Sequence, residues 1–371
     1  MRFAIPLFAL LASMLPAQPA QADSGIITIA QVVDLSGPNG DTGKDFWTGA
    51  KVYFDSVNAK GGINGRRINH VFRDDQGQPA QTLALTRQLV QEYRPAVLFG
   101  YMGAEGIEAV AKDGLLARDN LALVGPYAGV DSQADSNVVY LRASQADEAR
   151  KIVRQTRGLG LDRLAIYHGS DDLGRSGGQS LAAALAEAGL RPVANVADIR
   201  SNSAAVAQQI FKTQPQAVVL AAPTIASANF IREYRKLSPG TQFFALSSIN
   251  HQTLLEFLGS PKAAQGVAVT TLAPSPFNPV SPIAREHVRA MKTYRDEAPS
   301  YASLEGYIAA KYLVDALKNS KSSDPATVSH AIAATRKLDL GGYLVEFNGN
   351  SRRGSRYIDL AVFTGSGTLT N

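Results

Sequence analysis

The feature that most constrains the fold is an alternation of short apolar runs with amphipathic segments. Residues 26–33 are apolar and rich in β-branched side chains, which predicts a buried strand. Glycine, proline and asparagine at 36–40 end that strand, and apolar residues at spacings of three and four predict a helix over 46–58. A second strand at 67–73 and a second helix at 80–92 follow. This order is typical of a parallel α/β sheet, which binds ligands beside the turns that follow its strands.

The alternation continues in two successive blocks, which predict two lobes. Further strands are expected in the first block at 96–100, 121–124 and 138–142, and in the second at 164–168, 192–196, 217–221, 242–246 and 266–270. Helices at 283–295, 303–318 and 328–335 and closing strands at 343–347 and 358–363 complete the pattern. A chain of 371 residues is longer than one hydrophobic core usually serves.

We therefore expect two Rossmann-like lobes with parallel sheets. The N-terminal lobe is predicted to comprise residues 23–142 and 272–347, and the C-terminal lobe residues 143–271 and 348–371. Three crossovers, near 142–144, 270–272 and 347–350, would then form a hinge that lets the lobes close on a ligand.

The first 22 residues have the pattern of a signal peptide. Arg2 gives a basic start, residues 3–15 are apolar, and Ala20-Gln21-Ala22 matches a cleavage site before Asp23. The alternative is a disordered apolar N-terminus. No cysteine follows the apolar run, so we expect a soluble periplasmic protein, cleaved after Ala22, rather than a lipoprotein.

Composition excludes several classes of function. The chain has no cysteine, which rules out thiol catalysis and thiolate metal sites. Its five histidines lack the paired spacing of metal ligands, and no dinucleotide fingerprint is present, so we expect no metal and no cofactor. The net charge is +5, but no basic run is interleaved with aromatic residues, which argues against nucleic acid. After the signal peptide, no apolar segment is long enough to insert into a membrane.

Four motifs resemble a known family. They are Ser36-Gly37-Pro38, Gly49-Ala50, Asn58 with the turn at 61–65, and Asp74-Asp75. Over residues 26–363 the chain resembles type I periplasmic solute-binding proteins, and among them the leucine/isoleucine/valine receptors of ABC transporters. The resemblance implies the fold with three crossovers and a monomeric, non-enzymatic receptor. Such a receptor would bind a small amino-acid-like, amide or carboxylate ligand and deliver it to an ABC permease.

Candidate ligand contacts lie where the predicted strands end, because those ends would face each other across the lobes. Gly103 allows a ligand to approach the backbone closely, and the helix expected from Ala104 offers free N–H groups to a carboxylate. The predicted contacts are Tyr101, Gly103, Ala104, Tyr127, Ala128, Gly129, Asp171, Asp172, Leu173, Thr224 and Ser248.

The chain departs from the pattern of the resembled receptors. The resemblance implies that the turns at Ala104 and at 127–129 hold the ligand carboxylate, but it places an aromatic residue at Leu173 and an acid near Ser248. Asp171 or Asp172 could replace that acid as the anchor for an ammonium group, or could simply cap the next helix. The ligand is therefore left open, and the basic net charge favours a carboxylate or amide.

The sequence also has to be compared with two other functions, a sensory receptor and a hydrolase, and two of its residues have a purely structural interpretation. The same closed form could dock on a membrane sensor rather than a permease. Residues 174–178 match G-x-S-x-G, the motif of a hydrolase nucleophile, but the preceding strand ends near His168, so Ser176 is better interpreted as a helix N-cap. For Tyr127, the alternative to a ligand contact is a packed aromatic residue at the rim of the cleft.

Overall fold

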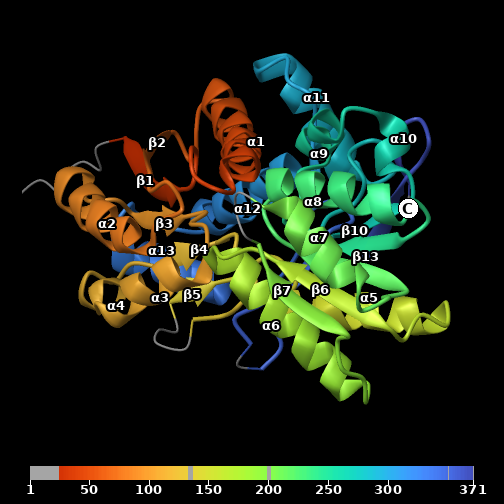
Figure 1. Ribbon diagram of the computed structural model, residues 1–371. Helices are drawn as coiled ribbons and strands as arrows, with labels where there is room; N and C mark the ends of the chain where they lie inside the picture. Colours follow the sequence, from red (N-terminus) through yellow and green to blue (C-terminus); the bar gives the residue numbers. More distant parts are fainter. Residues whose placement is uncertain (1–24, 133–136, 199–201, 350, 371) are drawn as a thin grey trace, which may run out of the picture.

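The computed structural model describes residues 25–132, 137–198, 202–349 and 351–370, and the predicted signal peptide lies outside these residues. The fold is α/β and contains two separate large sheets (Figure 1). The first has the order β2-β1-β3-β4-β5, and all its strands are parallel. They are β1 (Ile26–Val33), β2 (Arg67–Asp74), β3 (Val97–Phe99), β4 (Leu123–Val124) and β5 (Val138–Val139).

The second sheet has the order β14-β13-β10-β9-β8-β6-β7. Its parallel strands are β6 (Leu164–His168), β7 (Ala194–Ala197), β8 (Ala217–Ala221), β9 (Gln242–Ala245) and β10 (Val267–Thr271). The chain end adds β13 (Asp359–Phe363) and β14 (Leu369–Thr370) to one edge, and both pair antiparallel. The expected fold of two α/β lobes with mainly parallel sheets is therefore confirmed.

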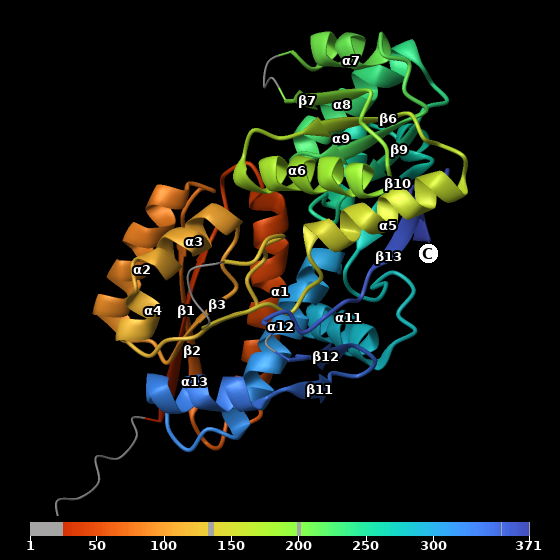
Figure 2. The ribbon, with the colours of Figure 1, turned by 90° about the horizontal axis from the view of Figure 1, so that it is seen from below.

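Helices cover both faces of each sheet (Figures 1 and 2). Those around the first sheet are α1 (Gly40–Ala59), α2 (Pro79–Tyr93), α3 (Ala104–Lys112), α4 (Leu115–Arg118), α11 (Pro282–Tyr294), α12 (Tyr301–Lys318) and α13 (Pro325–Ala334). Those around the second are α5 (Gln145–Gly158), α6 (Asp172–Glu187), α7 (Ser203–Phe211), α8 (Thr224–Leu237), α9 (His251–Leu258) and α10 (Pro261–Ala264). Strand side chains alternate between the faces, so Ala165 and Tyr167 join one hydrophobic cluster while Leu164 and Ile166 join another.

Helices α1 and α12 lie side by side in Figure 2 and make the closest helix contact of the first lobe. Two glycines allow it. A Cβ at Gly49 would lie 1.8 Å from the carbonyl oxygen of Ser303, and a Cβ at Gly306 would lie 2.0 Å from that of Phe46. The helices therefore meet backbone to backbone, and α12 is buried on nearly all sides.

Three local predictions were wrong. The segment at 343–347 does not close a large sheet, because β12 (Leu344–Glu346) pairs with β11 (Lys337–Asp339) in a hairpin. The strand expected at 138–142 ends at Val139, because Tyr140 bridges to Arg353 instead. The helix expected from residue 176 begins at Asp172, so Ser176 is not its N-cap.

The chain passes between the sheets three times, after β5, after β10 and after β12. The backbone segments that follow β5 and β12 are hydrogen-bonded to each other. The Tyr140 N–H donates to the Arg352 carbonyl and the Gly354 N–H donates to the Tyr140 carbonyl, both at 2.8 Å. The predicted lobe boundaries themselves stay a prediction.

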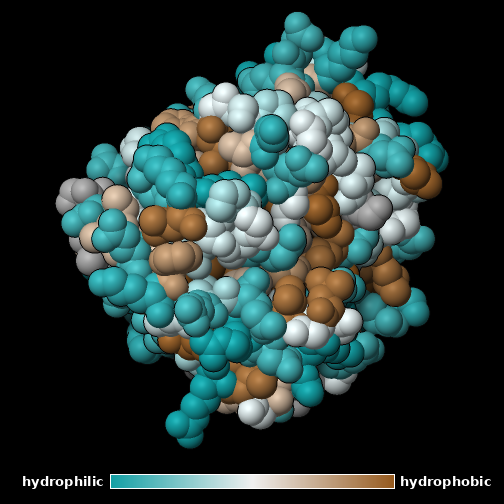
Figure 3. All heavy atoms as spheres, turned by 45° about the vertical axis from the view of Figure 1, so that its right-hand side comes forward, coloured by the Kyte–Doolittle hydropathy of each residue, from teal (hydrophilic) through white to brown (hydrophobic). Residues whose placement is uncertain are grey.

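The surface is mainly polar. The face drawn in Figure 3 is largely hydrophilic, with a group of apolar residues in its right half. Within the described ranges, no helix combines the length and the apolar character needed to cross a bilayer.

Candidate functional site

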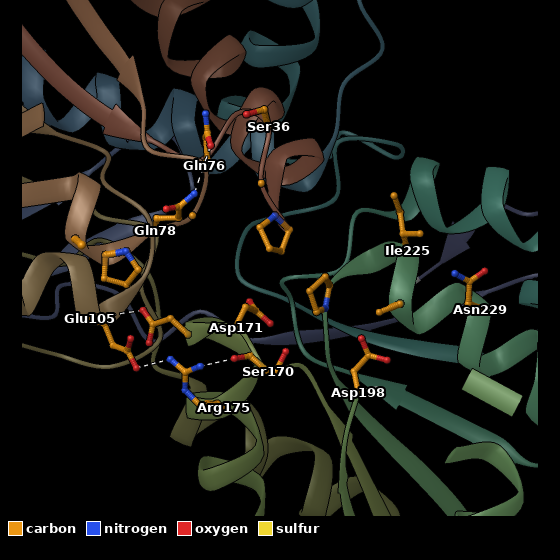
Figure 4. Close-up of a pocket in the computed structure, with 18 of the residues that line it drawn as sticks. Ser36, Gln76, Gln78, Glu105, Ser170, Asp171, Arg175, Asp198, Ile225 and Asn229 are labelled. Carbon is orange, nitrogen blue, oxygen red and sulfur yellow. Dashed lines mark hydrogen bonds and ion pairs between the residues drawn. The ribbon is translucent and has the colours of Figure 1, made fainter. Parts of the chain in front are cut away.

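A cleft of about 860 Å³ lies between the two lobes (Figure 4). The carboxyl ends of the strands face it, as expected for parallel sheets. The first lobe contributes the turn after β1, the turn after β2 and the start of α3. The second contributes the starts of α6 and α8 and the end of β7. Its polar lining comprises Ser36, Gln76, Gln78, Glu105, Ser170, Asp171, Asp172, Arg175, Asp198, Ser203 and Asn229.

Asp171 points across the cleft rather than into its own helix. It occupies the N-cap position of α6, yet its side chain accepts no hydrogen bond from the helix backbone. One carboxylate oxygen accepts from Asn39 Nδ2 of the other lobe at 2.9 Å. The other oxygen, Oδ1, is buried and has no hydrogen-bond partner within the described residues. The capping alternative is therefore wrong for Asp171, whose Oδ1 instead packs against Gly169 and Gly174.

Asp172 makes the neighbouring contact between the lobes. Its Oδ2 accepts from the backbone N–H of Glu105 in the first turn of α3, at 2.8 Å. Gly103 leaves the necessary space, because a Cβ there would lie 2.8 Å from the same oxygen. Burial raises the pKa of Asp172, and the N–H groups of Glu105 and Ala104 partly offset this. The Asp172 side chain thus fills the helix start that was expected to bind a ligand carboxylate.

Tyr127 belongs to a buried cluster between the lobes rather than to a rim. It is fully buried, its hydroxyl donates to the Ser247 carbonyl at 3.1 Å, and the Arg142 guanidinium lies 3.8 Å from its ring centroid. Arg142 also pairs with Glu305 at 2.9 Å, with both side chains 6% exposed, and donates to Ser247 Oγ at 2.7 Å. One guanidinium therefore connects α12 of the first lobe with the turn after β9 of the second.

The other predicted contacts differ in where the structure places them. Tyr101 is a core residue, fully buried beside α2 with its hydroxyl bonded to Thr86, and is not brought to the cleft. Ala128 is likewise in the core, and Gly129 packs against Gln145. Leu173 and Gly103 line a small cavity that adjoins the cleft.

Of two more predicted contacts, Ser248 lies at the interface between the lobes and Thr224 is bonded within the second lobe. The Ser248 carbonyl accepts from the Thr42 hydroxyl at 3.2 Å, and Thr224 Oγ1 accepts from the N–H of Asn250 at 3.0 Å. Sequence reasoning missed the polar partners Asn39, Glu105, Arg142 and Arg175. Only Arg142 carried a local signal, as a charge at the end of an otherwise apolar predicted strand.

The geometry does not support hydrolysis or a metal site. Ser176 lies in the second turn of α6 and donates to Gln145 Oε1 at 2.7 Å, with no histidine partner in the part of the chain that is described. Across the same residues, no group of three or more acidic and histidine side chains is placed to hold a metal ion.

The buried carboxyl group of Asp45 should make the stability of the protein depend on pH. It accepts from Asn250 Nδ2 across the lobes at 2.8 Å, and burial raises its pKa from 3.8 to about 6, a shift that hydrogen bonds from Ser300 and Asn250 only partly offset. Between these values the folded protein holds a proton at Asp45 that the unfolded chain releases, so this group favours folding as pH falls through 6. We expect Asp45→Asn to stabilise the protein by about 1–2 kcal/mol at pH 7.5 and hardly at all near pH 4.

Urea unfolding at both pH values measures this effect. Asp119→Asn, at a partly exposed position beside Arg118, is the matched control and should change stability little at either pH. A stabilisation by Asp45→Asn that is equal at both pH values would contradict the prediction.

Two α/β lobes that enclose a polar cleft at their strand ends define a two-lobed solute-binding protein. The chain belongs to the periplasmic binding protein family, whose model matches residues 26–367. The members of this family are solute-binding proteins, not enzymes, which confirms the expected absence of catalytic function.

Individual relatives agree with this assignment. The chain is 26% identical to Leu/Ile/Val-binding protein homolog 7 of Brucella abortus, over 91% of this chain and 88% of that protein. A crystal structure of a substrate-binding periplasmic protein from Ralstonia solanacearum matches with a TM-score of 0.85 and 32% identity, covering 92% of this chain and 99% of that one. The substrate-binding protein of a branched-chain amino acid transporter from Streptococcus pneumoniae, solved with isoleucine, shares the fold with a TM-score of 0.82 at 16% identity, covering 93% and 98%.

Proposed function

We propose that this protein is the substrate-binding protein of an ABC importer and binds a small amino-acid-like, amide or carboxylate ligand in the cleft between its lobes. The observation that carries the proposal is that both lobes contribute polar side chains to one cleft of about 860 Å³ at their strand ends. The names of the relatives, Leu/Ile/Val-binding and leucine-specific-binding proteins, support an amino-acid-like ligand.

Closure of the lobes is the mechanism in this proposal. The described form has direct hydrogen bonds between the lobes at several points around the cleft, which are Asn39–Asp171, Thr42–Ser248, Asp45–Asn250, Glu105–Asp172 and Tyr127–Ser247. A ligand that bridges both walls adds contacts only in the closed form and therefore selects it. The closed protein, a monomer, then docks on the membrane permease. Residues 1–22 direct export to the periplasm and are removed there.

The test is a thermal-shift screen of residues 23–371 against amino acids, their amides, amines and simple carboxylates. A ligand at one hundred times its dissociation constant stabilises the protein by about 2.7 kcal/mol, which is readily measured. Asp171→Asn removes the charge of the acceptor that faces the cleft and should weaken binding by roughly tenfold or more, since hydrogen bonds to a charged group contribute about 1.5–3 kcal/mol.

Asp119→Asn makes the same chemical change at a partly exposed residue that does not line the cleft, and it should leave binding unaltered. Two results would contradict the proposal. One is the absence of any stabilising ligand, and the other is a ligand whose affinity is the same in Asp171→Asn and the wild type.

A further inference from the structure

The first turn of α3 is already filled by a side chain of the opposite lobe. A helix start presents backbone N–H groups that no residue of the helix can use, and it attracts a negative charge. Here the N–H of Glu105 donates to Asp172 Oδ2 at 2.8 Å. Gly103 has a φ of +79° and lacks the Cβ that would otherwise lie 2.8 Å from that oxygen. The backbone before α3 is therefore shaped around the Asp172 carboxylate.

Neighbouring contacts hold this arrangement in place. Arg175, one turn further along α6, forms an ion pair with the Glu105 side chain, and its guanidinium also donates to the Ser170 carbonyl (Figure 4). On the other side, Asp171 accepts from Asn39 at 2.9 Å. Three successive contacts thus join the start of α6 to the first lobe, and Asp172 is the central one.

The charge of the cleft is opposite to that of the whole protein. The chain carries a net charge of +5. Among the described residues that line the cleft, the acidic side chains are Glu105, Asp171, Asp172 and Asp198. The basic side chain among them is Arg175, which is already paired with Glu105. A ligand carboxylate would enter a negative site and find the start of α3 occupied. Of the two ligand classes expected from the sequence, a carboxylate does not fit this lining, whereas an amide does.

We propose that Asp172 is a specificity-determining residue that takes the place of a ligand carboxylate at the start of α3, so that the receptor binds small amides or amines and rejects the corresponding free carboxylates. This inference rests on the proposed function and narrows its ligand class. An amide or ammonium N–H finds carboxylate acceptors in the same cleft, because Asp171 and Asp198 line its wall on the side of the second lobe. An amide or amine ligand only donates hydrogen bonds to this cleft. A free amino acid would also have to bring its negatively charged carboxylate into it.

The experiment compares L-leucine with L-leucinamide, which differ only in the carboxylate. Isothermal titration and thermal shift are measured for the wild type, Asp172→Ser, Asp172→Asn and Asp198→Asn. We expect the wild type to bind leucinamide at least tenfold more tightly than leucine. Asp172→Ser removes the carboxylate from the start of α3 and should improve leucine binding at least tenfold, while its binding of leucinamide changes less.

Two variants serve as controls. Asp172→Asn keeps a side chain of the same shape, whose oxygen still accepts from the Glu105 N–H, and it should continue to exclude leucine. Asp198→Asn removes one negative charge from the same cleft without vacating the start of α3, so it should not gain leucine binding. The unfolding midpoint of each variant without ligand confirms that it is folded. Asp172→Ala, which vacates the same space, provides a second measurement.

The outcomes separate this inference from the proposed function. A wild type that binds leucine as tightly as leucinamide overturns the inference and leaves the proposed function intact. A gain of leucine binding that is equal in Asp172→Ser and Asp198→Asn also overturns it, because simple charge removal then suffices. If no protein of the series binds either compound or any member of the wider panel, both the inference and the proposed function fail.

Discussion

Arg142→Ala is expected to lower the free energy of unfolding by about 3–5 kcal/mol. The guanidinium of Arg142 lies 2.9 Å from Glu305, and both side chains are 6% exposed. Its removal leaves a carboxylate buried without its counter-charge, which costs far more than the pair contributes when intact. The ring of Tyr127 loses a cation at 3.8 Å, and the Ser247 hydroxyl loses a donor at 2.7 Å. Urea unfolding followed by circular dichroism measures the loss.

Arg150→Ala is the matched control for this prediction. Arg150 is also an arginine paired with acidic side chains, those of Asp147 and Glu187, but its own side chain is 42% exposed. We expect a loss below about 1 kcal/mol there, because water screens exposed ion pairs. Replacing both members of the buried pair with apolar residues, Arg142→Met with Glu305→Leu, should recover much of the stability. Equal losses for Arg142→Ala and Arg150→Ala would mean that the Arg142–Glu305 pair is not buried in solution.

Gly306→Ala is expected to destabilise the protein by a similar amount, about 3–5 kcal/mol. The added Cβ would lie 2.0 Å from the carbonyl oxygen of Phe46 in α1, and 3.2 Å from the backbone nitrogen of Ala50. These atoms belong to a helix backbone and cannot rotate away as a side chain can. Helices α1 and α12 must therefore separate, which opens gaps in the hydrophobic cluster that both helices share.

The control for this second prediction is Gly158→Ala. Gly158 is the last residue of α5, and a Cβ there meets no atom within 4 Å. Because alanine favours the helix more than glycine does, this variant should be neutral or up to about 1 kcal/mol more stable. Thermal unfolding of the two variants provides the measurement. A loss of less than about 1 kcal/mol for Gly306→Ala would show that α1 and α12 can move apart without disturbing the core.

The order of strands and helices could be predicted because its signals are local. Apolar runs, helical spacing and glycine turns each lie within about ten residues and need no partner elsewhere. The β11–β12 hairpin was missed because its strands have three residues each and several of their side chains are exposed, so they carry little apolar pattern. The start of α6 was misplaced because Gly174 suggests a turn. It is instead a helical glycine that lets α6 pack against Gly169.

The polar contacts of the cleft could not be predicted in the same way. Arg142 and Glu305 are 163 residues apart in the sequence, and Glu105 and Asp172 are 67 apart. Nothing in the neighbourhood of either acid specifies its partner. The resemblance assigned the start of α3 to a ligand, whereas the structure fills it with the Asp172 side chain of the chain itself.

The pairing of α1 with α12 also determines the order in which the molecule is assembled. The turn after α1 is bonded to the end of α12, since the Asn64 side chain donates to the carbonyl of Lys318, 254 residues later. During synthesis, the strands and helices from α5 to β10 are complete before α12 exists, so they can collapse together first. The N-terminal lobe has to wait, with the apolar face of α1 uncovered, until nearly the whole chain has been made. Contacts over such long separations form slowly. Helix α1 is the first of the described helices to be synthesised, and it is therefore among the last to reach its final place.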